Sequence, residues 1–222
     1  MKITAVEPQK KRKGRFNIFL DGKFAFGADE DSVVNNRLIT GKDISTENLE
    51  KILFEVEIGK LMERMYRLFS IRQRSEKEIR DYLKILSFRN KIKDEEELSD
   101  VVIETLITNL KKKGLINDEI FAREWVNARQ RSKQKGRTAI KSELIQKGID
   151  KEIIENVLLE SGGEEKEKLL AVQSLEKKAR VWKGLEELEF KKKAIDFLIR
   201  RGFDYSLAKE VVIQFLNKRN DI

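Results

Sequence analysis

Hydrophobic residues alternate with polar ones near the start of the chain, and further on they recur every three or four residues. Residues 3–6, 15–20 and 23–27 show the alternating pattern, which is typical of β-strands. The last two segments are joined by Asp21-Gly22, a dipeptide that tolerates the positive φ angles of a two-residue hairpin turn. The sequence therefore predicts a small antiparallel β meander. Its apolar face would carry Phe16, Ile18 and Leu20.

Two helical signals follow the meander. Asp29-Glu30-Asp31 predicts a helical turn that covers the strands, because acidic residues complement the positive end of a helix. The same three carboxylates could belong to a metal cluster of a nuclease, but adjacent residues on a helix point in different directions, so the helix start is favoured. Ser45 then offers an N-cap to an apolar pattern from Leu49 to Leu68, which predicts one long helix or two.

A degenerate repeat occupies the rest of the chain. Arg72-Gln73-Arg74-Ser75 recurs as Arg129-Gln130-Arg131-Ser132, and each copy precedes a helical pattern. In each unit a second helix keeps apolar residues four apart and then reaches Gly148, Gly202 or, in the first unit, Ser87. Glycine at the end of a helix readily adopts the left-handed conformation that stops it, so each unit is predicted to be a three-helix module. The aligned apolar pairs are Ile79 and Leu83, Ile140 and Leu144, and Ala194 and Leu198.

The predicted fold is mostly α: tandem three-helix repeats forming an elongated curved array, preceded by the small antiparallel β meander. Capping signals at Ser75-x-x-Glu78, Asp150 and Asp204 support the helix starts, and residues 89–97 and 161–165 are predicted linkers. The predicted parts are the meander with a short helix at 1–44, a connecting helix at 45–58, and repeats at 59–115, 116–161 and 166–219.

Composition limits the chemistry that the chain can perform. The sequence has no cysteine and no histidine, which removes thiol nucleophiles and the commonest general base and metal ligand. Gly162-Gly163 lacks the Gly-Lys-Ser/Thr of a phosphate-binding loop. We therefore expect no enzyme, no cofactor and no metal site. No apolar run approaches the ~20 residues that cross a bilayer, so a cytoplasmic protein without membrane contact is expected.

Charge points to a polyanionic partner. The chain has 47 Lys and Arg against 39 Asp and Glu, a formal net charge of +8. Such a balance attracts nucleic acid or, second, an acidic protein surface. Between residues 129 and 137 cations alternate with no acid among them: a helix would place Arg129, Lys133 and Arg137 on one face, and a loop would place the cations on one edge. Alternatively, the segment is a solvated connection whose charges maintain solubility.

A second basic segment lies at the predicted turn between the first two strands, where it could touch phosphates or only protect a strand edge. A third patch near residues 177–193 is weakened by intervening glutamates. The aromatic pairs Phe121 with Trp125 and Trp182 with Phe190 are assigned to the core rather than to base stacking. The candidate partner-binding or DNA-binding residues are Lys10, Lys11, Arg12, Lys13, Arg15, Arg72, Arg74, Arg129, Arg131, Lys133, Lys135, Arg137 and Lys141.

Residues 114–149 contain, in this order, Gly114-Leu115-Ile116-Asn117-Asp118, Phe121-Ala122, Trp125, Arg129, Ile140, Glu143-Leu144 and Lys147-Gly148-Ile149. In residue type and order this second repeat resembles the RecX family, bacterial regulatory proteins that modulate the recombinase RecA. Arg74-Ser75 with Glu78-Ile79 matches the first repeat of that family, and Arg200-Arg201-Gly202-Phe203 matches the third, so the resemblance covers about residues 72–216. Residues before Gly59 look like an extension found in only part of the family. Ser87 in place of glycine and the insertion at 89–97 depart from the family pattern.

The resemblance implies a non-enzymatic regulator that binds RecA filaments on single-stranded DNA and mainly inhibits them, with roles in homologous recombination, DNA repair and the SOS response. Arg129, Arg131, Lys133 and Arg137 would help to hold the filament. Single-stranded or double-stranded DNA is an expected second partner, and the chain is expected to be a monomer. The alternative is a general nucleic-acid-binding helical protein that acts on DNA without RecA, although no helix pair has one clear base-reading face.

Overall fold

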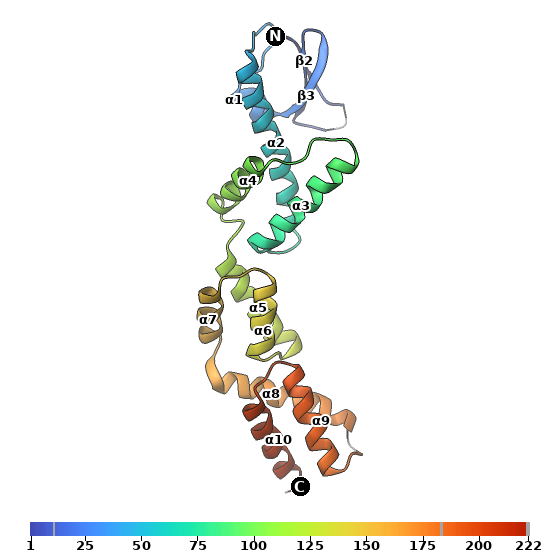
Figure 1. Cartoon of the computed structure of the whole chain (residues 1–222), viewed down its shortest axis with the longest axis vertical. Helices are drawn as coiled ribbons and strands as arrows, with labels where there is room; N and C mark the ends of the chain where they lie inside the picture. Colours follow the sequence, from blue (N-terminus) through green and yellow to red (C-terminus); the bar gives the residue numbers. More distant parts are fainter. Residues whose placement is uncertain (11, 183, 221–222) are drawn as a thin grey trace. The chain divides into compact units, whose positions relative to one another are not determined.

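The computed structural model describes residues 1–10, 12–182 and 184–220 (Figure 1). The chain divides into two compact units, one made of residues 1–73 with 82–116 and the other of residues 74–81 with residues 117 onward. Helix α3 (Glu76–Ile92) contributes its first residues to the second unit and the remainder to the first.

The first unit begins with the predicted antiparallel meander. Strands β1 (Ile3–Pro8), β2 (Arg15–Leu20) and β3 (Lys23–Asp29) form a sheet in the order β1-β2-β3. Asp21 and Gly22 have φ angles of 47° and 83°, which confirms the predicted hairpin turn. Ile18 and Leu20 are buried, and Phe16 packs beside them partly buried, so the predicted apolar face is confirmed.

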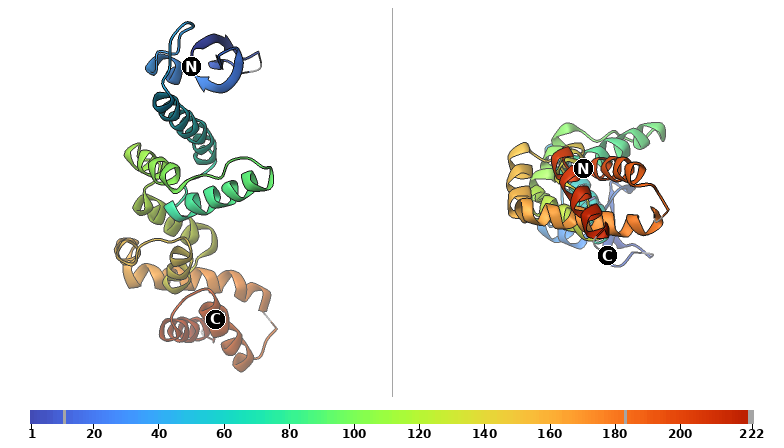
Figure 2. Two further views of the ribbon diagram at one scale, coloured as in Figure 1. Left: turned by 45° about the horizontal axis from the view of Figure 1, so that its top comes forward. Right: turned by 90° about the horizontal axis from the view of Figure 1, so that it is seen from below.

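Two helices cover the sheet. Helix α1 (Glu30–Asn35) begins at Asp29, whose side chain accepts a hydrogen bond from the Ser32 N–H at 2.8 Å. Helix α2 (Thr46–Phe69) begins at Ser45 as predicted, and Ile52 and Val56 of α2 join the core of the meander. Figure 2 shows α2 as one continuous helix. The boundary predicted between residues 58 and 59 therefore falls inside a single helix.

The first repeat departs from the predicted pattern at α3. Ser87 lies inside this helix, which continues to Ile92, whereas the aligned Gly148 and Gly202 follow the ends of their helices with φ angles of 76° and 91°. A serine inside a helix lowers helix stability far less than a proline does, so Ser87 does not end α3. The predicted linker at 89–97 is therefore helical in its first part. Helix α4 (Asp100–Lys112) follows and packs against α2.

The second repeat consists of α5 (Asp118–Lys133), α6 (Arg137–Gln146) and α7 (Lys151–Glu160). Asp150 caps α7 as predicted, accepting from the Glu152 N–H at 2.8 Å. Phe121 is buried, and Trp125 packs against the same core while half-buried, with the two rings stacked at 5.6 Å. The assignment of this aromatic pair to the core is confirmed.

The third repeat consists of α8 (Gly163–Ala179), a 3-10 turn η1 (Arg180–Trp182), α9 (Glu187–Arg200) and α10 (Tyr205–Asn220). Phe190 is fully buried between the Trp182 ring, edge-on at 5.9 Å, and the Phe215 ring, stacked at 5.7 Å. This aromatic pair also belongs to the core. Gly162, in the second predicted linker, has a φ of 119° immediately before α8.

No helix in the described ranges combines the length and the apolar character needed to span a membrane. Among the same residues, no three carboxylates are grouped as metal ligands would be. The carboxylates at 29–31 instead form the start of α1, as predicted.

Candidate partner-binding surface of the second repeat

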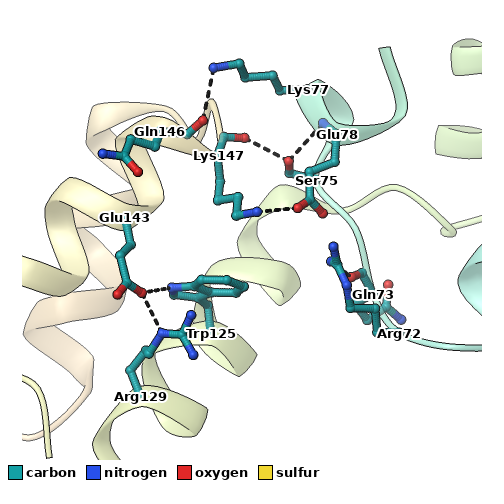
Figure 3. Close-up of polar contacts among 10 residues, drawn as sticks. All are labelled: Arg72, Gln73, Ser75, Lys77, Glu78, Trp125, Arg129, Glu143, Gln146 and Lys147. Carbon is teal, nitrogen blue, oxygen red and sulfur yellow. Dashed lines mark hydrogen bonds and ion pairs between the residues drawn. The ribbon is translucent and has the colours of Figure 1, made fainter. Parts of the chain in front are cut away.

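Trp125 on α5 is held by an ionic cluster that links α5 to α6 (Figure 3). Its indole N–H donates to Glu143 Oε2 at 2.7 Å. The Arg129 guanidinium lies 4.2 Å from the centre of the indole ring and donates from Nε to the same carboxylate at 2.5 Å. Lys135 Nζ donates to Oε1 of Glu143. Glu143 thus forms ion pairs with two of the predicted partner-binding cations, and Arg129 is part of the packing of its repeat.

The pKa of Glu143 reflects this cluster. Burial alone would raise the pKa of the carboxyl, but hydrogen bonds from Lys135, Arg129 and Trp125 outweigh burial and lower the pKa below its usual value. Glu143 therefore stays ionised into the acid range and keeps its neighbours paired.

A junction joins the start of α3 to the second repeat within the second unit (Figure 3). Ser75 is fully buried, and its hydroxyl donates to the Lys147 carbonyl oxygen at 2.7 Å. The Lys147 ammonium pairs with Glu78 and lies 5.2 Å from the centre of the Trp125 ring. One half of the predicted capping box is formed, because the Ser75 hydroxyl oxygen accepts a hydrogen bond from the Glu78 N–H at 3.3 Å. The Glu78 side chain is engaged with Lys147.

The same geometry recurs between the second and third repeats. The Gly136 N–H donates to the Arg201 carbonyl oxygen at 2.9 Å, and Arg201 aligns with Lys147. In both junctions the first N–H of the second helix donates to a carboxylate of the following repeat. The Glu76 N–H donates to Asp118 Oδ1, and the Arg137 N–H to Glu167 Oε1, each at 2.9 Å. The first N–H groups of a helix have no hydrogen-bond acceptor within their own helix. Asp118 and Glu167 supply that acceptor here.

The predicted basic segment is neither one helix nor one loop. Helix α5 ends at Lys133, Gln134 adopts a left-handed conformation with φ 41°, and α6 starts at Arg137. Arg137 is therefore on a different helix from Arg129 and Lys133, so the single shared face is wrong. Lys141 pairs with Glu155 of α7.

Two cations of the segment remain exposed. Arg131 and Lys133 lie in the last turn of α5, and neither is in an ion pair within the described part of the chain. We call these two residues the α5-end cations. Their charges are available to a partner, whereas Arg129, Lys135 and Lys141 are each already in an ion pair with a glutamate.

Arg201 is a cation that the site prediction omitted. Its guanidinium donates to the Lys133 carbonyl oxygen and lies 4.8 Å from the centre of the Phe197 ring. It therefore adds positive charge beside the α5-end cations. Alignment of Arg201-Gly202 with Lys147-Gly148 was the signal in the sequence that could have identified it.

The predicted N-terminal site residues occupy different environments. Lys10, Arg12 and Lys13 are exposed at the β1–β2 turn, and Lys11 lies outside the described residues. Arg15 differs, because its side chain is only 10% exposed and pairs with Glu63 of α2 at 3.2 Å. Arg15 thus joins the meander to α2.

The two predicted site residues before α3 are placed by local contacts. Arg72 donates from its guanidinium to the Gln73 carbonyl oxygen at 2.8 Å. Arg74 is half-buried. Contact of either residue with a partner stays a prediction.

Family models match three parts of the chain. The RecX second three-helix domain matches residues 117–158, the RecX third three-helix domain matches residues 167–212, and the regulatory protein RecX N-terminal domain matches residues 1–45. The N-terminal match includes the whole meander, which the sequence analysis compared to an extension found in only part of the family.

Curated relatives and solved structures agree with these matches. The regulatory protein RecX of Listeria monocytogenes serovar 1/2a is 32% identical over 94% of this chain and 74% of its own length. That of Bacillus subtilis strain 168 is 33% identical over 96% of this chain and 76% of its own length. A crystal structure of regulatory protein RecX has a TM-score of 0.71 at 28% identity, covering 95% of this chain and 98% of its own. RecX from Lactobacillus salivarius has a TM-score of 0.61 at 26% identity, covering 72% and 97%.

Proposed function

Because the chain belongs to the RecX family of regulatory proteins, we propose that it binds filaments of the recombinase RecA on single-stranded DNA and lowers their activity. The observation that carries this proposal is the family match over the N-terminal domain and two repeats. A regulatory role needs a binding surface rather than a catalytic centre, and the chain offers cations at the end of α5 for that purpose.

The α5-end cations Arg131 and Lys133 make the principal contact in this proposal. Both are exposed and unpaired within the described residues, so neither has to leave an intramolecular partner in order to bind. Arg201 adds charge beside them. Arg129 is assigned to holding Trp125 and Glu143, because reversing its charge would disrupt α5 and α6 before it tested binding.

Repeats suit a filament because a filament presents the same surface many times. Modest contacts made by several modules of one chain add up through effective concentration. Binding at a few positions would then slow the cycle of neighbouring subunits, so the proposal predicts inhibition at low ratios of regulator to recombinase.

Co-sedimentation with RecA filaments on single-stranded DNA tests the proposal. The wild-type chain should pellet with filaments, and Arg131→Glu/Lys133→Glu should bind at least about tenfold more weakly, since two charge contacts are reversed. Lys177→Glu/Lys192→Glu is the matched control, because both lysines are exposed and the net charge changes equally. Equal weakening of both variants would contradict a specific role for the α5-end cations.

A general nucleic-acid-binding function is the second candidate, and the exposed basic turn with Lys10, Arg12 and Lys13 favours it. Such a protein would bind naked DNA without RecA. Its affinity would fall by roughly 10³ between low and physiological salt if six phosphates were neutralised. Parallel sedimentation with DNA alone separates the two functions.

A further inference from the structure

Helix α3 carries an apolar stripe that faces solvent. Ile85, Phe88 and Ile92 have exposed fractions of 54%, 62% and 68%. Spacings of three and four residues place all three on one face of the helix. Several large apolar side chains on one exposed face are typical of an interaction site, whereas an isolated exposed apolar side chain is common on any protein surface.

The end of α3 that carries this stripe is held in place by the chain that follows it. The Leu98 N–H donates to Ser87 Oγ at 3.0 Å, and the Asn90 side chain donates to the Glu96 carbonyl oxygen at 3.2 Å. Lys91 pairs with Glu97 at 2.8 Å. At 100° per residue Ser87 and Asn90 lie on the opposite side of the helix from the stripe, and Lys91 lies at its edge. The stripe therefore belongs to an ordered helix end whose other side is already occupied.

Two cations flank the stripe. Lys84 and Arg89 are exposed on either side of it, and neither is in an ion pair within the described residues. An apolar stripe between two free cations is complementary to an apolar groove with carboxylates on its rim.

We propose that residues 84–92 of α3 dock as a helix into an apolar, carboxylate-rimmed groove on a partner protein. This inference rests on the proposed function, in which that partner is a subunit of the RecA filament. Phe88 is the central anchor, with Ile85 and Ile92 one turn to either side.

Other occupants fit the stripe less well. Nucleic acid would use aromatic stacking, and two of the three stripe residues are isoleucines, which have no ring. Self-association through the stripe is measured by the unlabelled chain in the test below. An acidic protein groove matches both the shape and the charge.

The absence of cysteine makes a direct test possible, because one introduced cysteine can be labelled uniquely. Ile92→Cys carries an environment-sensitive fluorophore, and Leu159→Cys on α7, at a site 64% exposed, is the control position. RecA filaments on oligothymidylate, oligothymidylate alone and excess unlabelled chain are added in turn. Only the filament should shift the emission to the blue, and only from position 92.

A second measurement uses unlabelled variants. Phe88→Ser/Ile92→Ser should bind filaments about tenfold or more weakly than wild type, since two apolar anchors are lost. Leu159→Ser should bind normally. The unfolding midpoint of each variant should stay near that of wild type, because the changed side chains are exposed.

The outcomes separate the two proposals. A wild-type chain that does not bind filaments contradicts the proposed function. Filament binding with no blue shift at position 92 and no loss in Phe88→Ser/Ile92→Ser overturns the docking proposal alone. A blue shift produced by oligothymidylate or by the unlabelled chain overturns it in favour of nucleic acid or self-association.

Discussion

Ser75 donates its hydroxyl hydrogen bond to the carbonyl oxygen of Lys147 at 2.7 Å, across 72 residues of sequence. The same oxygen atom of Ser75 accepts from the Glu78 N–H, so one buried side chain both caps α3 and fixes the turn after α6. In the next junction the backbone N–H of Gly136 replaces the hydroxyl as donor. Consecutive repeats are thus joined by equivalent positions that use different chemical groups.

Ser75→Ala should lower the free energy of unfolding by about 1–3 kcal/mol, because the cap is lost and a buried carbonyl loses its donor. Denaturant unfolding followed by circular dichroism measures this. Ser142→Ala is the control, since its hydroxyl is exposed and bonds only to Thr138 one turn earlier. Equal stability of the two variants would contradict the role assigned to Ser75.

Gly136→Ala should destabilise the second unit by about 1–3 kcal/mol, since the added methyl group would overlap the backbone of Gly202 and Phe203. Gly184→Ala is the matched control, because a methyl group there meets open space. A normal unfolding midpoint for Gly136→Ala would show that the second junction is not closely packed.

Glu143→Gln should lower the free energy of unfolding at neutral pH, and this free energy should then fall less steeply as the pH is lowered. The pKa of Glu143 is lower in the folded chain than in the unfolded chain, so its stabilisation is present above the ordinary carboxyl pKa and is lost as pH falls through the lowered value. Unfolding measured from neutral pH to about pH 3 checks this. Glu124→Gln, at an exposed position on α5, should retain the wild-type pH profile.

Glu167 should behave in the opposite way. Burial is the largest effect and raises the pKa of this carboxyl, only partly offset by the hydrogen bond from the Arg137 N–H. A raised carboxyl pKa opposes folding at neutral pH and does so less as pH falls. Glu167→Gln keeps an oxygen for the Arg137 N–H, so its neutral-pH stability should equal or exceed that of wild type. A clear loss would show that the negative charge itself is needed.

Local signals predicted much of the fold. The Asp21-Gly22 hairpin and the caps at Ser45 and Asp150 depend on neighbouring residues, and each is present. Ser87 was misleading because serine aligned with the two helix-ending glycines but, unlike them, lies inside its helix, which continues to Ile92. Its hydroxyl accepts from the Leu98 N–H, a contact that the repeat alignment did not indicate.

The candidate site was less predictable than the fold. Alternating cations at residues 129–137 suggested one continuous basic surface, but Glu143 approaches from α6 and pairs with Arg129 and Lys135. Spacing along the sequence cannot show which charges meet across helices. Within this segment we therefore propose Arg131 and Lys133, which are in no ion pair among the described residues, as the residues that contact the partner.

The most direct test of the central claim is the single-stranded-DNA-dependent ATPase of preassembled RecA filaments, titrated with this chain well below one molecule per subunit. The rate should fall with the wild-type chain, Arg131→Glu/Lys133→Glu should inhibit less than wild type, and Lys177→Glu/Lys192→Glu should inhibit like wild type. An unchanged rate with the wild-type chain, while it still binds naked single-stranded DNA, would contradict the account and favour a general nucleic-acid-binding protein.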